Sequence, residues 1–139
     1  VLDQALPHAG WSSDIHLKQW EKLVINSIIN PLTALSGEKN GSLLARREEI
    51  EVLCHELHPL LLRQGLPQSE ETWAETVLKV ANLTRENYSS MQQDIAHGRP
   101  TEIDYLCGYL LHKAQPLSIP LPLQQQLYQA IKSKELSHE

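Results

Sequence analysis

The sequence has 139 residues and a formal net charge of −5, a length that suits one domain built around one hydrophobic core. Its 12 lysine and arginine residues are dispersed, with Arg46-Arg47 as the one adjacent pair, so the charge pattern argues against a nucleic-acid-binding protein. The longest apolar runs, such as residues 60–62, are far too short to cross a bilayer, and no signal-peptide pattern is present. We therefore expect a single domain over residues 1–139 that binds neither nucleic acid nor a membrane.

The two cysteines, Cys54 and Cys107, fall in segments with helical periodicity. We expect them to be buried free thiols of a cytoplasmic protein and not a disulfide. Cys54 lies near Glu51, His55 and His58, a set that could bind a metal ion, but the spacing matches none of the strong zinc motifs. A structural role for these side chains is therefore expected, and no metal site.

Turn residues and apolar periodicity divide the chain into helical segments. Residues 1–13 contain proline, glycine and two serines, and we expect an extended segment that ends in a Ser/Asp helix cap. Pro31 disfavours helical geometry at Asn30, so the first helix should break or kink there. Pro59 should bend the second helix, and residues 116–122 should form an extended connector. The periodicity predicts helices over residues 14–29, 43–64, 69–87, 103–114 and 121–136, with a short helical turn after residue 87.

No alternating strand pattern occurs in the sequence, which predicts an all-α fold. In the second and third helices the apolar residues recur at helical spacing and indicate which face is buried. The expected core positions are Leu44, Ile50, Leu53, Leu57 and Leu61 in the second helix, and Trp73, Val77, Val80 and Leu83 in the third.

Lys22, Asn26 and Asn30 recur at four-residue steps in the first helix and form a narrow polar stripe about 80° wide. Apolar residues border this stripe, with Leu23 on one side and Ile29 on the other. Asparagine is a poor helix former, and its amide needs a hydrogen-bonding partner once it is removed from water. A bound polar ligand is one such partner, and the mixed surface of an ordinary amphipathic helix is the alternative. The periodicity alone does not separate the two.

Lysine is suited to proton donation when partial burial lowers its pKa, and Trp20 and Leu23 flank Lys22 closely enough to bury it in part. A solvated lysine is the simpler interpretation. Glu102 follows a loop and begins a helical segment, where capping and the helix dipole would account for a carboxylate. The pair Ser89-Ser90 could offer hydroxyls to an anion, but serine pairs are also common helix starts. The sequence contains no Gly-x-Gly-x-x-Gly or Walker motif for holding a nucleotide phosphate.

Taken together, several blocks in this order and spacing resemble ketopantoate reductase, and the resemblance covers almost the whole chain. It extends only to the C-terminal helical domain of that enzyme, a compact all-α domain of the 6-phosphogluconate dehydrogenase C-terminal-like type. The N-terminal Rossmann domain has no counterpart here, and Val1 in place of Met suggests that an upstream part has been removed. The blocks are Trp20-x-Lys22-Leu-x-x-Asn26-x-x-x-Asn30-Pro-Leu-Thr-Ala, Asn40-Gly41, Ser89-Ser-Met-x-Gln-Asp-Ile95 and Thr101-Glu-Ile-Asp-Tyr-x-x-Gly108.

The resemblance implies an NADPH-dependent oxidoreductase that reduces 2-dehydropantoate to pantoate in pantothenate and coenzyme A biosynthesis. In that family, the substrate lies in a cleft between the helical domain and the Rossmann domain, which binds most of the cofactor. This chain alone is then expected to be inactive, with the Rossmann domain as its partner in cis and a homodimer as a further association. The alternative is a non-catalytic helical interaction or dimerisation module that retains the reductase scaffold.

The resemblance also implies residue roles. Lys22 resembles the general acid that protonates the developing alkoxide. Glu102 resembles the acidic residue near the substrate and the nicotinamide ribose, which makes it both a catalytic and a cofactor-binding candidate. The residues that resemble substrate-binding groups are Asn26, Asn30, Asn40 and Ser90, with the Ser90 hydroxyl at the substrate carboxylate.

Overall fold

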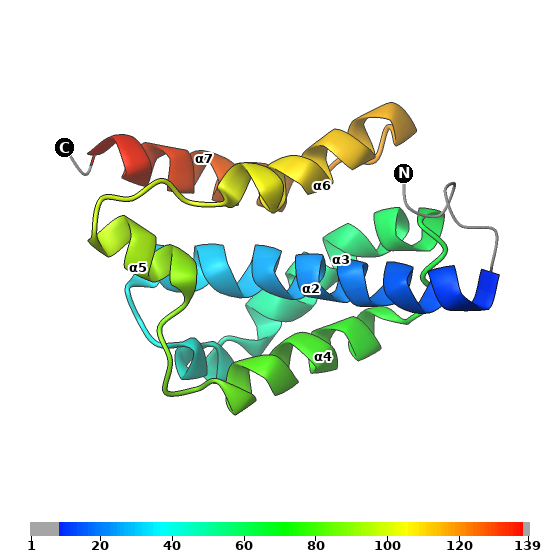
Figure 1. Cartoon of the computed structure of the whole chain (residues 1–139), viewed down its shortest axis with the longest axis horizontal. Coiled ribbons are helices and arrows are strands. Elements are labelled where there is room, and N and C mark those ends of the chain that lie inside the picture. The colour runs from blue at the N-terminus through cyan, green and yellow to red at the C-terminus, as the bar shows by residue number, and fades with distance from the viewer. Residues whose placement is uncertain (1–8, 138–139) are drawn as a thin grey trace.

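The long helix α2 (Ala9–Ser36) runs through the middle of the molecule and carries the other helices around it (Figure 1). The structure is a computed structural model, and it describes residues 9–137. Within this range no strand occurs, which confirms the all-α prediction. The remaining elements are η1 (Asn40–Ala45), α3 (Arg47–Arg63), α4 (Glu70–Leu83), α5 (Ser90–Ala96), η2 (Ile103–Tyr105), α6 (Cys107–Ala114), η3 (Gln115–Leu117) and α7 (Pro122–Ser137).

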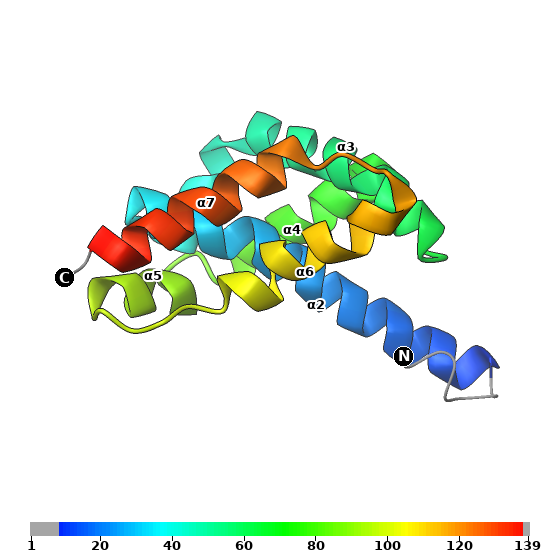
Figure 2. The ribbon, with the colours of Figure 1, turned by 90° about the horizontal axis from the view of Figure 1, so that it is seen from above.

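The helices form two pairs and one cap around α2. Helices α3 and α4 pack together on one side of it, helices α6 and α7 pack together on another, and the short helix α5 covers its C-terminal half. The first turns of α2 extend beyond the bundle (Figure 2). None of the helices within residues 9–137 combines the length and the apolar character that a membrane span requires.

Two apolar clusters hold these helices together. The larger one joins α2, α3, α4 and α6, and its fully buried side chains include Ile28, Leu57, Trp73 and Leu110. The smaller one lies where α5, η2, α6 and α7 meet the C-terminal half of α2, and it consists of Ala34, Met91, Ile103, Leu106, Cys107 and Ile131. The smaller cluster therefore fixes the elements that carry several of the candidate site residues.

Helix α2 continues through Pro31 to Ser36, so the predicted break at Asn30 is wrong. A proline inside a helix removes the N–H that would bond the carbonyl four residues earlier, here that of Ser27. In this structure the Sγ atom of Cys107 donates to that carbonyl oxygen at 3.6 Å, and both residues are fully buried. Burial raises the pKa of Cys107 to about 12, which keeps the thiol protonated and able to donate. A side chain from α6 thus replaces the missing backbone donor.

Replacing Cys107 with alanine should lower the free energy of unfolding by about 1–3 kcal/mol, because it leaves the buried Ser27 carbonyl without a donor. Cys54→Ala is the matched control, since Cys54 is also fully buried but makes no hydrogen bond within the described residues. Urea titration followed by circular dichroism measures both losses. The Cys107 variant should lose more stability than the Cys54 variant, and equal losses would contradict the role assigned to the thiol.

The other helix ends differ from the predicted ones by a few residues. Helix α2 begins at Ala9, so the extended segment predicted over residues 1–13 is wrong for residues 9–13, and residues 1–8 lie outside the described part. Gly37, with a φ of +73°, ends the helix by donating its N–H to the Thr33 carbonyl at 2.8 Å.

Two predicted core positions are exposed. Leu44 is 42% exposed because it lies in the 3-10 turn η1, ahead of α3, and Leu43 is buried in its place. Leu83 is 71% exposed because it is the last residue of α4, which ends before residue 87. Val80 is half-buried. The predicted positions that are buried as expected are Ile50, Leu53, Leu57, Leu61, Trp73 and Val77.

Helix α3 continues through Pro59 to Arg63, and the bend expected at this proline stays a prediction. The connector predicted to be extended over residues 116–122 begins within η3 and turns at Ser118, whose φ of +56° is left-handed. The extended prediction is therefore wrong for the first part of this segment. Cys54 and Cys107 are buried free thiols, as the sequence predicted.

Candidate functional site

The polar stripe of α2 is present on one side of a continuous helix. Lys22 is exposed, and Asn26 and Asn30 are half-buried. At 1.5 Å per residue the stripe is about 12 Å long. None of the three side chains makes a hydrogen bond or an ion pair with another described residue. The amides and the ammonium group are therefore available to a ligand.

Trp20 and Leu23, the two neighbours expected to bury Lys22 in part, do not do so. Trp20 is only 6% exposed because its ring packs in the main core, more than a third of a turn around the helix from Lys22. Leu23 is half-buried and also packs against the core. The ammonium group consequently faces solvent within the part of the molecule that the structure describes.

Helix α5 closes the C-terminal end of the stripe. Thr33 continues the same side of α2 one turn beyond Asn30, and its hydroxyl is hydrogen-bonded to the Ser89 hydroxyl at 2.7 Å. The Ser89 Oγ also accepts the Gln92 backbone N–H at 3.1 Å and thereby caps α5. Both Thr33 and Ser89 are buried, whereas Ser90 is exposed and its hydroxyl has no partner among the described residues. Ser89 therefore has a structural role, whereas the Ser90 hydroxyl is available to a ligand.

Thr33 was not among the residues singled out from the sequence. It follows Asn30 by three residues and so lies on the same side of a helix, but the predicted end of the helix at Asn30 excluded it. The signal was therefore present in the periodicity and was lost with the helix boundary.

Asn40 lies beside the segment that leads into α5, but its amide points inward. It is 7% exposed, and its Nδ2 donates to the Thr84 Oγ1 at 2.9 Å. Its backbone N–H donates to the Asn87 carbonyl at 2.9 Å, and the N–H of Gly41 donates to the Arg85 carbonyl at 3.1 Å. A Cβ on Gly41 would lie 2.9 Å from that carbonyl oxygen, so only glycine permits this approach. The Oδ1 of Asn40 is buried without a hydrogen-bond partner.

Glu102 is exposed at the start of η2, and its carboxylate makes no hydrogen bond or ion pair with a described residue. The capping role considered for it belongs to Thr101, whose Oγ1 accepts the Ile103 backbone N–H at 3.2 Å. Helix capping therefore does not account for a carboxylate at this position.

Tyr105, at the end of η2, lies near the side of α2 next to the stripe. Tyr105, three residues after Glu102, lines a groove of about 240 Å³ together with Gln19, Leu23 and other aromatic residues. Gln19 is one turn before Lys22 on the same side of the helix. Glu102 directly precedes η2, and the last residue of η2, Tyr105, reaches residues of α2 that lie beside the stripe.

The candidate side chains carry one ammonium group, two carboxamides, a hydroxyl and a carboxylate, and each of them is exposed or half-buried. Donors of this kind suit a small anionic ligand with a carbonyl oxygen, because the ammonium and amide groups stabilise negative charge on oxygen. The side chains that contribute are Lys22, Asn26, Asn30, Ser90 and Glu102.

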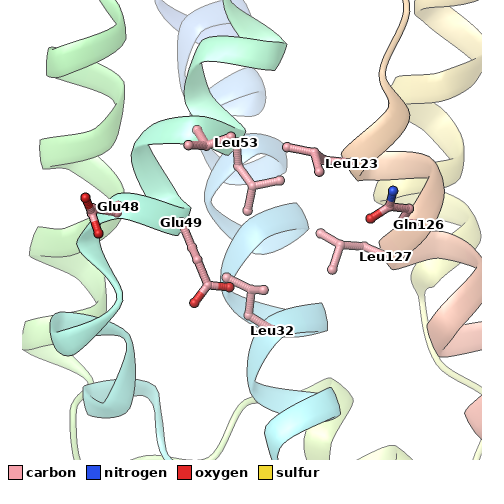
Figure 3. Close-up of a pocket in the computed structure, with 8 residues that line it drawn as sticks. Leu32, Glu48, Glu49, Leu53, Leu123, Gln126 and Leu127 are labelled. Carbon is pink, nitrogen blue, oxygen red and sulfur yellow. The ribbon is translucent and has the colours of Figure 1, made fainter.

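A second hollow, of about 330 Å³, lies between α2, α3 and α7 (Figure 3). It is lined mainly by leucine side chains, and Leu32 contributes to it from a face of α2 about 160° around the helix from Asn30. The carboxylate of Glu49 at its edge is already paired with Arg46 at 2.7 Å. None of the predicted site residues lines this hollow, which is apolar and separate from the stripe.

No group of three or more His, Cys, Asp or Glu side chains within residues 9–137 is arranged to hold a metal ion. His55 and His58 both contact the Glu70 carboxylate, at 2.9 Å and 3.5 Å. Burial raises the pKa of Cys54 to about 12, and the nearby carboxylates of Glu70 and Glu51 add to this shift. The histidines thus tie α3 to the start of α4.

Residues 14–135 match the family model described as the C-terminal part of ketopantoate reductase PanE/ApbA. The chain is 41% identical to 2-dehydropantoate 2-reductase of Yersinia pestis over 139 residues, which is 100% of this chain and 46% of that protein. It shares its fold with the crystal structure of a probable 2-dehydropantoate 2-reductase, panE, from Bacillus subtilis. The TM-score is 0.73 at 37% identity, over 82% of this chain and 39% of that chain.

A dimeric ketopantoate reductase from Staphylococcus aureus is also similar, with a TM-score of 0.69 and 25% identity over 86% of this chain and 43% of that one. The chain thus spans about half the length of the relatives that it matches. These similarities confirm the family resemblance seen in the sequence. The chain belongs to the ketopantoate reductase family and corresponds to the C-terminal domain of its members.

Proposed function

We propose that residues 1–139 form the helical substrate-binding domain of a reductase that converts 2-dehydropantoate to pantoate, on the route to pantothenate and coenzyme A. Family membership supports the reaction, and the 46% coverage of the Yersinia pestis relative supports the assignment to one domain of a larger enzyme. The observation that carries the proposal is the open stripe on α2. There, Lys22 and two asparagines keep their hydrogen-bonding groups free on one side of a single helix.

The proposed roles follow from the charge that develops during reduction. Negative charge appears on the ketone oxygen, and the Lys22 ammonium group donates a proton to that oxygen as the general acid. The Asn26 and Asn30 amides donate hydrogen bonds that hold the substrate at a fixed angle to Lys22. The Ser90 hydroxyl, at the other end of the stripe, binds the substrate carboxylate.

When bound, NADPH supplies the hydride that reduces the ketone carbon. The sequence has no glycine-rich phosphate-binding motif, and Glu102 is the one candidate side chain whose chemistry suits the nucleotide. Its exposed, unpartnered carboxylate can accept hydrogen bonds from ribose hydroxyls. The residues described here therefore fit the ribose edge of the cofactor, and we assign the rest of its binding to a Rossmann domain in cis.

Asn40 belongs to the substrate-binding set through the family motif, and its buried Oδ1 lacks a partner. Its Nδ2, however, is held by Thr84. A direct contact with the substrate therefore requires the buried amide to become accessible, and in the arrangement seen here Asn40 holds the loop that leads into α5.

A helical interaction or dimerisation module is the competing function. It is favoured by large apolar side chains at the surface, such as Tyr105 and Leu136, which are 78% and 75% exposed. Self-association is compatible with catalysis, and the dimeric Staphylococcus aureus relative supports a homodimer of the parent enzyme. The free buried thiols favour a cytoplasmic location.

The full-length parent protein should oxidise NADPH when 2-dehydropantoate is added, and the absorbance of NADPH at 340 nm reports the rate. The isolated chain should show no turnover, because Lys22 remains exposed and the cofactor has no glycine-rich loop to bind. Absence of turnover by the intact parent with this substrate would contradict the proposal and favour the interaction module.

A further inference from the structure

The last turns of α7 hold the N-terminal end of the segment that carries Glu102. Glu135 accepts two hydrogen bonds at its Oε2, from the Thr101 backbone N–H at 2.8 Å and from the Thr101 hydroxyl at 2.6 Å. The Glu135 side chain is only 18% exposed, although it is charged. A carboxylate that is mostly removed from water and used twice by one residue makes strong charge-assisted hydrogen bonds.

The same face of α7 also holds the C-terminal end of this segment, at Asp104. Asp104 accepts the Tyr128 hydroxyl at 2.6 Å through Oδ1 and pairs with the Lys132 ammonium at 3.3 Å through Oδ2. Lys132 also lies 3.6 Å from Glu135, so the two attachments are linked. Tyr128, Lys132 and Glu135 share one helix face because they are spaced by four and three residues.

Between these attachments, the backbone is anchored by an apolar contact. Ile103 is fully buried in the small cluster that also contains Ile131 of α7. Thr101, Ile103 and Asp104 are thus all fixed to α7 or to the core below it. Glu102 alone in this run has a side chain without a partner, and it is exposed.

We infer that Glu135 is a positioning residue that sets the place of the Glu102 carboxylate through Thr101. The inference rests on the proposed function, in which Glu102 lies at the substrate and the nicotinamide ribose. Glu135 itself is turned toward Thr101 and not toward the stripe, so it acts on the reaction only through the backbone of residues 101–104. A displacement of about 1 Å at a reacting group can reduce a rate up to a hundredfold.

In the full-length reductase, Glu135→Ala should lower kcat/KM about tenfold and weaken NADPH binding, measured by quenching of protein fluorescence. Glu135→Gln keeps a carbonyl oxygen that can accept from Thr101, and it should restore most of the rate. Lys134→Ala is the matched control, because Lys134 is the exposed neighbour on α7 and its side chain has no partner among the described residues. An unchanged rate in Glu135→Ala would overturn the inference.

A double-mutant cycle with Glu102→Gln separates positioning from a general structural effect. If Glu135 acts through Glu102, adding Glu135→Ala to Glu102→Gln should cause no further loss of kcat/KM. If the kcat/KM losses of the two single variants multiply in the double variant, the inference is overturned. Amide hydrogen exchange provides a readout apart from activity, and the Thr101 N–H should exchange faster in Glu135→Ala and as in wild type in Lys134→Ala.

If Glu135→Ala fails to fold, Thr101→Val and Thr101→Ser replace it. Valine removes the hydroxyl that donates to Glu135 and should slow the enzyme, whereas serine keeps it and should not. Equal rates in the two variants would overturn the inference. Failure of the proposed function gives a different result from failure of this inference: the wild-type parent shows no turnover, or Glu102→Gln is fully active. Either result would also overturn the role of Glu135.

Discussion

Lys22→Met in the full-length reductase should lower kcat by about 10²–10⁴-fold, the usual contribution of a positioned general acid. Methionine has about the same length as lysine but cannot donate a proton to the ketone oxygen. Because Lys22 is exposed and makes no hydrogen bond or ion pair with another described residue, its loss should leave the fold unchanged. Stopped-flow or steady-state NADPH oxidation measures the effect.

Two further variants make this result specific to Lys22. Lys22→Arg keeps the positive charge, but arginine does not release its proton at neutral pH, so it should not restore the rate. Lys79→Ala removes an exposed lysine from α4 and should leave kcat unchanged. A Lys22→Met enzyme with more than about a tenth of the wild-type kcat would contradict the assignment of the general acid.

Asn26→Asp should lower kcat/KM for 2-dehydropantoate by about 10²-fold or more. The substitution keeps the shape of the side chain but places a negative charge, half-buried, against a negatively charged substrate. Two like charges about 4 Å apart near a protein surface repel by up to about 4 kcal/mol. The effect should appear largely in KM, since the carboxylate opposes binding of the substrate before any chemistry occurs.

Asn82→Asp is the matched control for this charge, because Asn82 is an exposed asparagine of α4 on a different part of the surface. It changes the net charge of the protein by the same amount without touching the stripe. If both aspartate variants reduce kcat/KM equally, the loss at Asn26 reflects overall charge and the asparagine does not bind substrate.

The helical segments were predictable because apolar periodicity is a local property of the chain. The stripe of Lys22, Asn26 and Asn30 was predictable for the same reason. The continuation of α2 beyond Asn30 was not, because Cys107, which supplies the donor that Pro31 lacks, lies 80 residues away from Ser27 in the sequence. Local proline rules describe only the loss of that donor.

Which candidate side chains are buried and which are free depends even more on contacts between residues far apart in the sequence. The two serines at the start of α5 look alike in sequence, and the contact with Thr33, 56 residues away, determines that Ser89 is the buried one. Thr84 turns the Asn40 amide inward from 44 residues away. Glu102 looked like a helix cap, but the adjacent Thr101 caps η2 instead, and the contact that holds Thr101 comes from Glu135, 34 residues away.

A crystal structure of the full-length reductase with NADP⁺ and pantoate would show whether the stripe on α2 binds the substrate. The proposed mechanism predicts that the Lys22 Nζ lies within hydrogen-bond distance, about 2.7–3.2 Å, of the 2-hydroxyl oxygen of pantoate, which is the ketone oxygen of the substrate. It also predicts that the Asn26 and Asn30 amides contact the same ligand. Pantoate bound away from this side of α2, with Lys22 still facing solvent, would contradict it.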